Sequence, residues 1–188
     1  MKKFVGHQAE GLYDPAQEHD ACGVGFVADI KGRKSHKIVS SALVILKSLL
    51  HRGACGSEEN TGDGVGILIQ KPDKFFQRES KKLGFQLPEF EQYGAGLVFL
   101  PRNPEQSSRC QEIFSRIVEE EGQQLLGWRD VPTDDSLIGP TALEGEPTFK
   151  QIFIGRNENI EDALAFERKL YVIRKRVEHE IWNSEMDE

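Results

Sequence analysis

Residues 36–50 carry the feature that most restricts the fold of this sequence, an apolar stripe too wide to be buried against a single neighbour. Apolar residues recur there at spacings of three and four, which is the period of a helix. Ser35 is placed to cap the start of this helix, and Gly53 lies just past its end, where a left-handed residue commonly stops a helix. A helix with so wide a stripe needs cover on more than one side, so we expect it to be sandwiched between layers. The stripe consists of Ile38, Val39, Ala42, Leu43, Ile45, Leu46, Leu49 and Leu50.

The rest of the chain alternates between strand-like and helix-like patterns. Short runs of β-branched and aromatic residues predict strands, and three- and four-residue periods between capping residues predict helices. Both the α/β and the α+β class fit this order of elements. Strands are predicted at 22–29, 65–70, 93–100, 125–131 and 149–155, and helices at 72–83, 104–121 and 159–183.

The composition excludes several classes of partner. The chain has 24 Lys and Arg against 31 Asp and Glu, a net charge of −7, whereas binding to nucleic-acid phosphates needs clustered cations. No apolar run approaches the about 20 residues that span a bilayer, and residues 1–21 lack the apolar stretch of a secretory signal. Three cysteines without a Cys-x-x-Cys pair suit a reducing compartment and argue against structural zinc. We therefore expect a cytoplasmic protein with neither nucleic acid nor membrane as partner.

Glycine clusters in this chain invite a phosphate-binding interpretation. Residues Gly23 to Ala28 fit the loose pattern G-x-G-x-x-A. That pattern binds a pyrophosphate only between a strand and a helix N-terminus, whereas here the segment is itself strand-like. Gly62 to Gly66 lead into a predicted strand, so they offer no helix dipole either. The pattern favours glycines that serve close packing and tight turns over a dinucleotide site.

Cys22 has two interpretations. A lone cysteine is most often a small buried hydrophobic residue. Cys22, however, follows the small Ala21 at the boundary between an irregular leader and the first predicted strand. Cleavage before it would give one residue both a thiol, with a pKa of ~8.5, and a free α-amine, with a pKa of ~7.7–8.0 that suits a base. This pairing is the arrangement of an N-terminal nucleophile.

A second candidate cluster is the polar loop that follows the helix of residues 36–50. It begins with His51-Arg-Gly-Ala54 and continues to Thr61-Gly-Asp-Gly64. Its structural interpretation is cations at the negative end of a helix dipole, a capping glycine and a turn aspartate. Its functional interpretation is a binding loop between two buried elements, which is where sites often lie.

Four motifs, taken together and in order, resemble the start of the large subunit of glutamate synthase, which opens with a class II glutamine amidotransferase domain. The resemblance is specific from about residue 11 to residue 70, and the later elements are compatible with it. It implies an α+β fold, the N-terminal-nucleophile four-layer αββα sandwich, of which this chain holds only the amino-terminal part. It also implies a leader over residues 1–21 and the amidotransferase portion over residues 22–188. The motifs are Gly11-Leu-Tyr-Asp-Pro15, Asp20-Ala-Cys-Gly-Val-Gly-Phe26, His51-Arg-Gly-Ala54 and Thr61-Gly-Asp-Gly64.

The resemblance implies a chemistry for these residues. Cleavage between Ala21 and Cys22 would free the nucleophile, whose thiolate attacks the side-chain amide of L-glutamine, releases ammonia and leaves a γ-glutamyl thioester. Arg52 matches the family's arginine near the nucleophile, where a cation favours the thiolate. Gly53, Thr61 and Asp63 match the adjoining loop and are candidate substrate-binding residues.

One departure from the family bears on activity. The family takes its oxyanion hole from an Asn-Gly pair, and none of the five asparagines here is followed by glycine. Losing one oxyanion donor costs about 10²–10³ in rate, so we expect the isolated chain to be inactive. We interpret it as a truncated part of a glutaminase domain; the alternative is a non-catalytic remnant or binding module of the same family.

The resemblance also implies partners for the complete enzyme. These are the rest of the large subunit, a possible small subunit, FMN, an iron–sulfur cluster, and NAD(P)H or ferredoxin as electron donor. None of these cofactors is expected to bind this chain.

Overall fold

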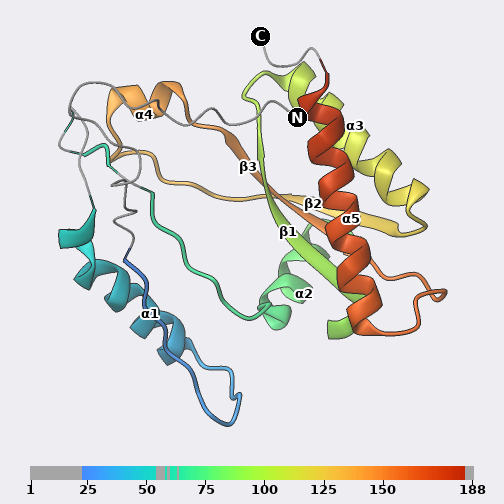
Figure 1. Ribbon diagram of the computed structural model, residues 1–188, viewed down its shortest axis with the longest axis horizontal. Coiled ribbons are helices and arrows are strands. Elements are labelled where there is room, and N and C mark those ends of the chain that lie inside the picture. Colours follow the sequence, from blue (N-terminus) through green and yellow to red (C-terminus); the bar gives the residue numbers. More distant parts are fainter. Residues whose placement is uncertain (1–22, 54–57, 59, 63, 185–188) are drawn as a thin grey trace, which may run out of the picture. The chain divides into compact units, whose positions relative to one another are not determined.

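A computed structural model describes residues 23–53, 58, 60–62 and 64–184. The chain divides into two compact units, residues 1–68 and residues 69–188, and each is described by itself (Figure 1). Cys22 and Asp63, together with the leader 1–21, lie outside the described residues.

The first unit is organised around helix α1 (His36–Ser48), which the sequence predicted. The side chain of Ser35 accepts a hydrogen bond from the backbone N–H of Ile38, so the predicted cap is confirmed. Before it, the chain reverses in a turn in which Gly32 has φ +67° and donates its N–H to the carbonyl of Asp29 at 2.8 Å. The carboxylate of Asp29 also pairs with Arg33 at 2.9 Å, which fixes the turn.

The end of α1 differs from the prediction. The helix stops at Ser48, and a 3₁₀ turn, η2 (Leu50–Arg52), follows it. Gly53 has φ −86° and ψ 151°, so it is extended and does not stop the helix in the left-handed conformation. Within the described residues no side chain of α1 is buried and Leu43, for example, is exposed, so the expected cover on more than one side stays a prediction.

The strands predicted at 22–29 and 65–70 do not form in the part of the chain that the structure describes. Residues 23–29 and 65–70 contain no strand, and Val24, Phe26 and Leu68 are exposed. These segments have the apolar residues typical of a strand, but a strand forms only where a neighbour satisfies its backbone hydrogen-bonding groups. No described segment pairs with either of them along its length.

The second unit confirms most of the predicted elements and adds two, a 3₁₀ turn and a short helix. Its helix α4 was missed, because five residues in a proline-rich stretch show no period. Helix α5 begins four residues later than predicted, where the side chain of Asp162 caps it by accepting from the N–H of Ala165. The elements are α2 (Asp73–Lys82), η3 (Phe90–Gln92), β1 (Tyr93–Leu100), α3 (Pro104–Glu120), β2 (Gln124–Asp130), α4 (Pro140–Glu144), β3 (Thr148–Gly155) and α5 (Ala163–Trp182).

The three strands form one antiparallel sheet in the order β1-β3-β2. Leu100 pairs with Thr148 and Tyr93 with Gly155, so β3 runs back along the whole of β1. Because β3 is antiparallel to both neighbours, β1 and β2 are parallel and are joined through α3. This is a split βαβ arrangement with β3 inserted between the two parallel strands.

Helices α3 and α5 cover one face of the sheet, as Figure 1 shows. The core between these layers is aliphatic, and Ile117 and Val118 at its centre are fully buried. Phe114 adds an edge-on contact with Trp128 of β2, with 5.5 Å between the ring centres. The buried members of this core are Ile113, Ile117, Val118, Ile152, Ile154, Ile173 and Val177.

The opposite face of the sheet is only partly covered. At one end, Phe76 of α2 packs edge-on against Phe153 at 5.2 Å. At the other end, Leu97 and Phe99 of β1 are 52% and 61% exposed, although Phe99 pairs edge-on with Phe149 across the strands. This half of the face therefore presents apolar side chains to solvent.

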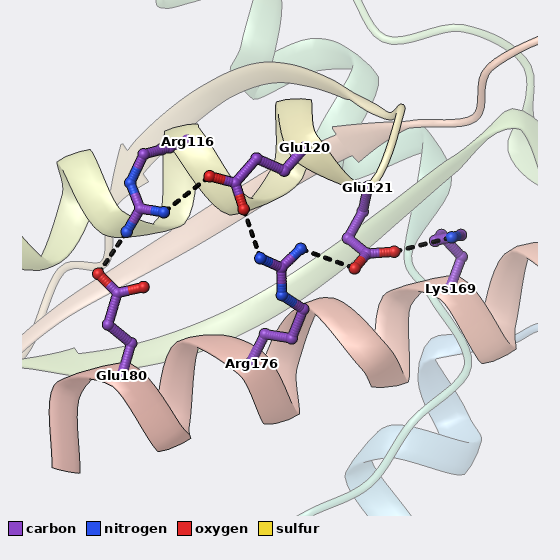
Figure 2. A network of polar contacts seen from close by, with 6 residues as sticks. All are labelled: Arg116, Glu120, Glu121, Lys169, Arg176 and Glu180. Atoms are coloured by element: carbon purple, nitrogen blue, oxygen red, sulfur yellow. Dashed lines mark hydrogen bonds and ion pairs between the residues drawn. The ribbon is translucent and has the colours of Figure 1, made fainter. Parts of the chain in front are cut away.

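An alternating row of six charges joins α3 to α5 (Figure 2). The carboxylate of Glu121 accepts from both Lys169 and Arg176 at 2.8 Å. Hydrogen bonds from these two cations lower its pKa, Lys169 contributing most. The row continues from Arg176 to Glu120, then to Arg116 and Glu180. The contacts run in opposite directions along the two helices, so α3 and α5 are antiparallel.

Candidate active site

The turn after α1 presents the His-Arg-Gly motif. The ring nitrogen Nδ1 of His51 lies 3.0 Å from the carbonyl oxygen of Ser48, and the N–H of Gly53 donates to the carbonyl of Leu50 at 3.2 Å. These bonds satisfy carbonyl groups at the end of the helix that have no partner within the helix, and they hold the backbone of Arg52 in a tight turn. The side chain of Arg52 lies outside the described part of the molecule, so its direction stays a prediction.

The segment after Cys22 packs on α1 at a single close approach. A Cβ atom built on Gly25 would lie 2.4 Å from Cγ2 of Ile45, where no real atom fits. Gly25 therefore allows the backbone of residues 23–29 to approach the helix. This confirms the prediction of close packing for this glycine, whereas Gly64 and Gly66 face open space.

The turn at Asp29 to Gly32 sends the chain back along itself within the first unit (Figure 1). Residues 23–29 run in one direction and α1 returns in the other, with Gly25 opposite Ile45. The Gly23 end of the extended segment and the Arg52 end of α1 therefore lie on the same side of this contact. Sequence reasoning missed this contact, because no period links a glycine to one isoleucine twenty residues later.

The loop residue Thr61 takes part in a local turn. Its hydroxyl donates to the carboxylate of Glu58 at 2.6 Å, and its N–H donates to the carbonyl of Glu58 at 3.2 Å. Glu58 was not among the predicted site residues, although a carboxylate three residues before a threonine is the pattern of such a turn. Asp63, the next polar residue of the motif, lies outside the described residues.

Cys110 shows the structural behaviour expected of a lone cysteine. It lies on the inner face of α3 and is 3% exposed. Burial raises the pKa of its thiol, which disfavours the reactive thiolate. Cys110 thus provides an internal reference against which the reactivity of Cys22 can be measured.

Two features are absent from the described residues, a cluster of metal-binding side chains and a membrane-spanning helix. No three His, Cys, Asp or Glu side chains among these residues are placed to hold a metal ion. No helix within the same ranges is long and apolar enough to cross a membrane.

Comparison with known families assigns the class of protein. Residues 22–188 match the family described as glutamine amidotransferases, class II. The chain therefore belongs to the class-II glutamine amidotransferase family, and the mixed α and β architecture of the structure is consistent with that family.

The curated relatives narrow the similarity to one kind of enzyme. The chain is 46% identical over 172 residues to the glutamate synthase [NADPH] large chain of Bacillus subtilis, a match that covers 92% of this chain and 11% of the relative. It is 41% identical over 179 residues to the glutamate synthase [NADH] of Schizosaccharomyces pombe, covering 92% of this chain and 8% of the relative. It is 36% identical over 185 residues to ferredoxin-dependent glutamate synthase 2, chloroplastic, of Arabidopsis thaliana, covering 95% of this chain and 11% of the relative. The chain thus spans about a tenth of the length of these relatives, and the predicted resemblance is confirmed.

Proposed function

We propose that this chain carries the nucleophile of a glutamate synthase glutaminase site and that the nucleophile is Cys22. The observation that carries the proposal is where the family match begins. The match to the family model starts at residue 22, so that model opens on the cysteine and leaves out residues 1–21. A leader removed before Cys22 accounts for that boundary, because removal makes the thiol and the α-amine parts of one terminal residue.

The proposed reaction is hydrolysis of the side-chain amide of L-glutamine. The α-amine of Cys22 takes the thiol proton, and the thiolate adds to the amide carbon. The C–N bond then breaks, the proton passes to the departing nitrogen, and ammonia leaves behind a γ-glutamyl thioester. Water cleaves the thioester to glutamate and restores the thiol, so the cycle needs no oxidant.

Arg52 is proposed to favour the thiolate at this site. A cation near a thiol lowers the pKa of the thiol and so raises the thiolate fraction at neutral pH. The antiparallel packing of residues 23–29 on α1 supports the assignment, because it places the ends that lead to Cys22 and Arg52 on the same side of the Gly25–Ile45 contact. Gly53, Thr61 and Asp63 are proposed to line the glutamine site beside them.

We further propose that the sheet of the second unit belongs to the four-layer sandwich of N-terminal-nucleophile proteins. Its two helices cover one face, while Leu97 and Phe99 leave the other face apolar and half uncovered. A second sheet packed about 10 Å away would bury that face.

The remaining partners are proposed by analogy with the whole enzymes. The relatives' names divide among NADPH, NADH and ferredoxin as electron donor. We place the electron donor, FMN, the iron–sulfur cluster and any small subunit on polypeptide other than this chain. A cytoplasmic location remains part of the proposal, and one of these relatives is named as chloroplastic.

A labelling experiment tests the proposed nucleophile. The chain is placed in the Bacillus subtilis large chain in exchange for the matched 172 residues, which supplies the rest of the enzyme. A glutamine analogue with an electrophilic ketone in its side chain is added, and labelled peptides are identified by mass spectrometry. We expect labelling of Cys22, slowed by excess glutamine.

Matched variants separate the proposal from its alternative. Cys22→Ala should abolish labelling and glutamine hydrolysis, whereas Cys110→Ala should label like the parent. Arg52→Gln should retain labelling but shift its pH dependence upward, because the thiolate then forms at a higher pH. Labelling that persists in Cys22→Ala would contradict the proposal. A chimera that folds but neither reacts nor hydrolyses glutamine would support a non-catalytic module.

A further inference from the structure

We propose that the outer edge of β1 is the acceptor for a fourth antiparallel strand, supplied by polypeptide that follows α5. This interaction surface lies at the edge of the sheet in the second unit rather than on its face. Three features of the second unit support it: the direction of the backbone groups of β1, the groove beside them and the path of α5.

The pairing of β3 shows which groups of β1 point outward. The N–H of Val131 donates to the carbonyl of Phe149, so the odd-numbered groups of β3 face β2 and its even-numbered groups face β1. Gly94 and Gly96 are opposite Ile154 and Ile152 and therefore bond to β3. The backbone groups one residue away from them, at Ala95, Leu97 and Phe99, consequently point to the free edge.

The start of this edge is already held by a side chain. Nζ of Lys71 donates to the carbonyl oxygen of Tyr93 at 2.5 Å and lies 3.8 Å from the centre of the Tyr93 ring. This contact confirms that the odd-numbered carbonyls of β1 point away from β3. In the described part of the chain, no strand pairs with the remainder of the edge.

A groove of about 510 Å³ runs beside the free edge. It follows β1 over five consecutive residues, Tyr93 to Leu97, or about 17 Å of strand. An extended peptide can use such an edge by adding its own hydrogen bonds to the sheet. The groove is lined by residues that include Lys71, Phe76, Gly94, Ala95, Gly96 and Leu170.

Helix α5 lies against the edge strand that such a peptide would join. A Cβ atom on Gly94 would come within 2.5 Å of Cδ1 of Leu170, so the helix approaches the strand closely there. The 20 residues of α5 extend about 30 Å, and the eight residues of β1 about 26 Å. The helix is therefore long enough to pass along the whole strand.

The direction of α5 identifies the occupant. Lys169 meets Glu121 at the end of α3, and Glu180 meets Arg116 one turn nearer the start of α3, which follows Leu100. The helix thus carries the chain back toward the end of the sheet where β1 finishes. A strand that starts there and enters the groove runs antiparallel to β1. It would make β3, α5 and the new strand a second split βαβ unit that mirrors β1, α3 and β2, completing the order βαββαβ.

Amide hydrogen exchange tests the proposal. The 188-residue chain is compared with the same chain extended by the about 15 residues that follow the matched segment in the Bacillus subtilis relative, enough for a connection and a strand. In the short chain, the amides of Ala95, Leu97 and Phe99 should exchange at least about 100-fold faster than those of Gly96 and Val98. In the extended chain, all five should be protected.

A proline pair provides a second test, in which each variant is made in both the short and the extended chain. Ala95→Pro removes an outward N–H, and Gly96→Pro removes one that bonds to β3; proline is tolerated only where the N–H faces solvent. With a fourth strand in place, Ala95→Pro should lower the midpoint of thermal unfolding by about 5 °C or more. Its effect should disappear in the short chain, whereas Gly96→Pro should destabilise both chains.

Three outcomes would overturn the proposal. Outward amides that stay fast in the extended chain would show that the added residues do not occupy the edge. Protection already present in the short chain would show that another segment of this chain occupies it. Protection that grows with protein concentration would assign the edge to a second copy.

Discussion

Replacing Gly25 by alanine is the perturbation whose size follows most directly from the structure. The added Cβ would lie 2.4 Å from Cγ2 of Ile45, over 1 Å closer than ordinary carbon contact at about 3.5 Å. Cγ2 is a branch of a β-branched side chain in a helix, which has one strongly preferred rotamer and cannot turn aside. Relief therefore requires a backbone shift of residues 23–29 away from α1, and overpacking of this kind costs about 1–3 kcal/mol.

Chemical denaturation at equilibrium measures this cost. Gly25→Ala should lower the free energy of unfolding by about 1–3 kcal/mol. Gly66→Ala is the matched control, because no atom lies within 4 Å of the place its new methyl group would take, and its stability should be unchanged or slightly higher. Ile45→Ala removes Cγ2, so adding Gly25→Ala to that variant should cause no further loss in the free energy of unfolding. A Gly25→Ala protein as stable as the parent would refute the packing of this segment on α1.

Two further predictions concern the second unit. Ile117 is fully buried between α3 and the sheet. Ile117→Ala should therefore lower the free energy of unfolding, measured by chemical denaturation, by about 2–5 kcal/mol. A loss below about 1 kcal/mol would contradict the assigned core. Glu121→Gln should lower the free energy of unfolding by about 1 kcal/mol at pH 7. The folded state lowers the pKa of Glu121 below its usual 4.5, so the stability it confers is present above that pH and is lost on acidification through the lower folded-state pKa. The difference in unfolding free energy between parent and variant should therefore shrink in acid.

The elements of the second unit could be predicted from sequence because their signals are local. Asn103 and Pro104 open α3 as a cap and a first-turn proline, and the apolar period of Ile113 and Ile117 faces the sheet as expected. The order of the strands could not be predicted, because it depends on pairing between residues far apart along the chain, such as Leu100 and Thr148.

In the first unit, local signals did not suffice to predict the strands. The apolar runs at 22–29 and 65–70 predict strands, yet a strand depends on a partner that local pattern does not reveal. For the candidate site, the sequence identified the motif residues but not the Gly25–Ile45 contact that relates their segments. The positions of Cys22 and Asp63 and the side chain of Arg52 remain predictions.

The mass of the mature amino terminus tests the central claim most directly. The chain carried within the Bacillus subtilis large chain is purified in a form that hydrolyses glutamine, and its first peptide is identified by mass spectrometry. We expect that peptide to begin at Cys22, with residues 1–21 absent, and we expect Cys22→Ala to be without glutaminase activity. A fully active protein that still begins with Met1 would contradict the account.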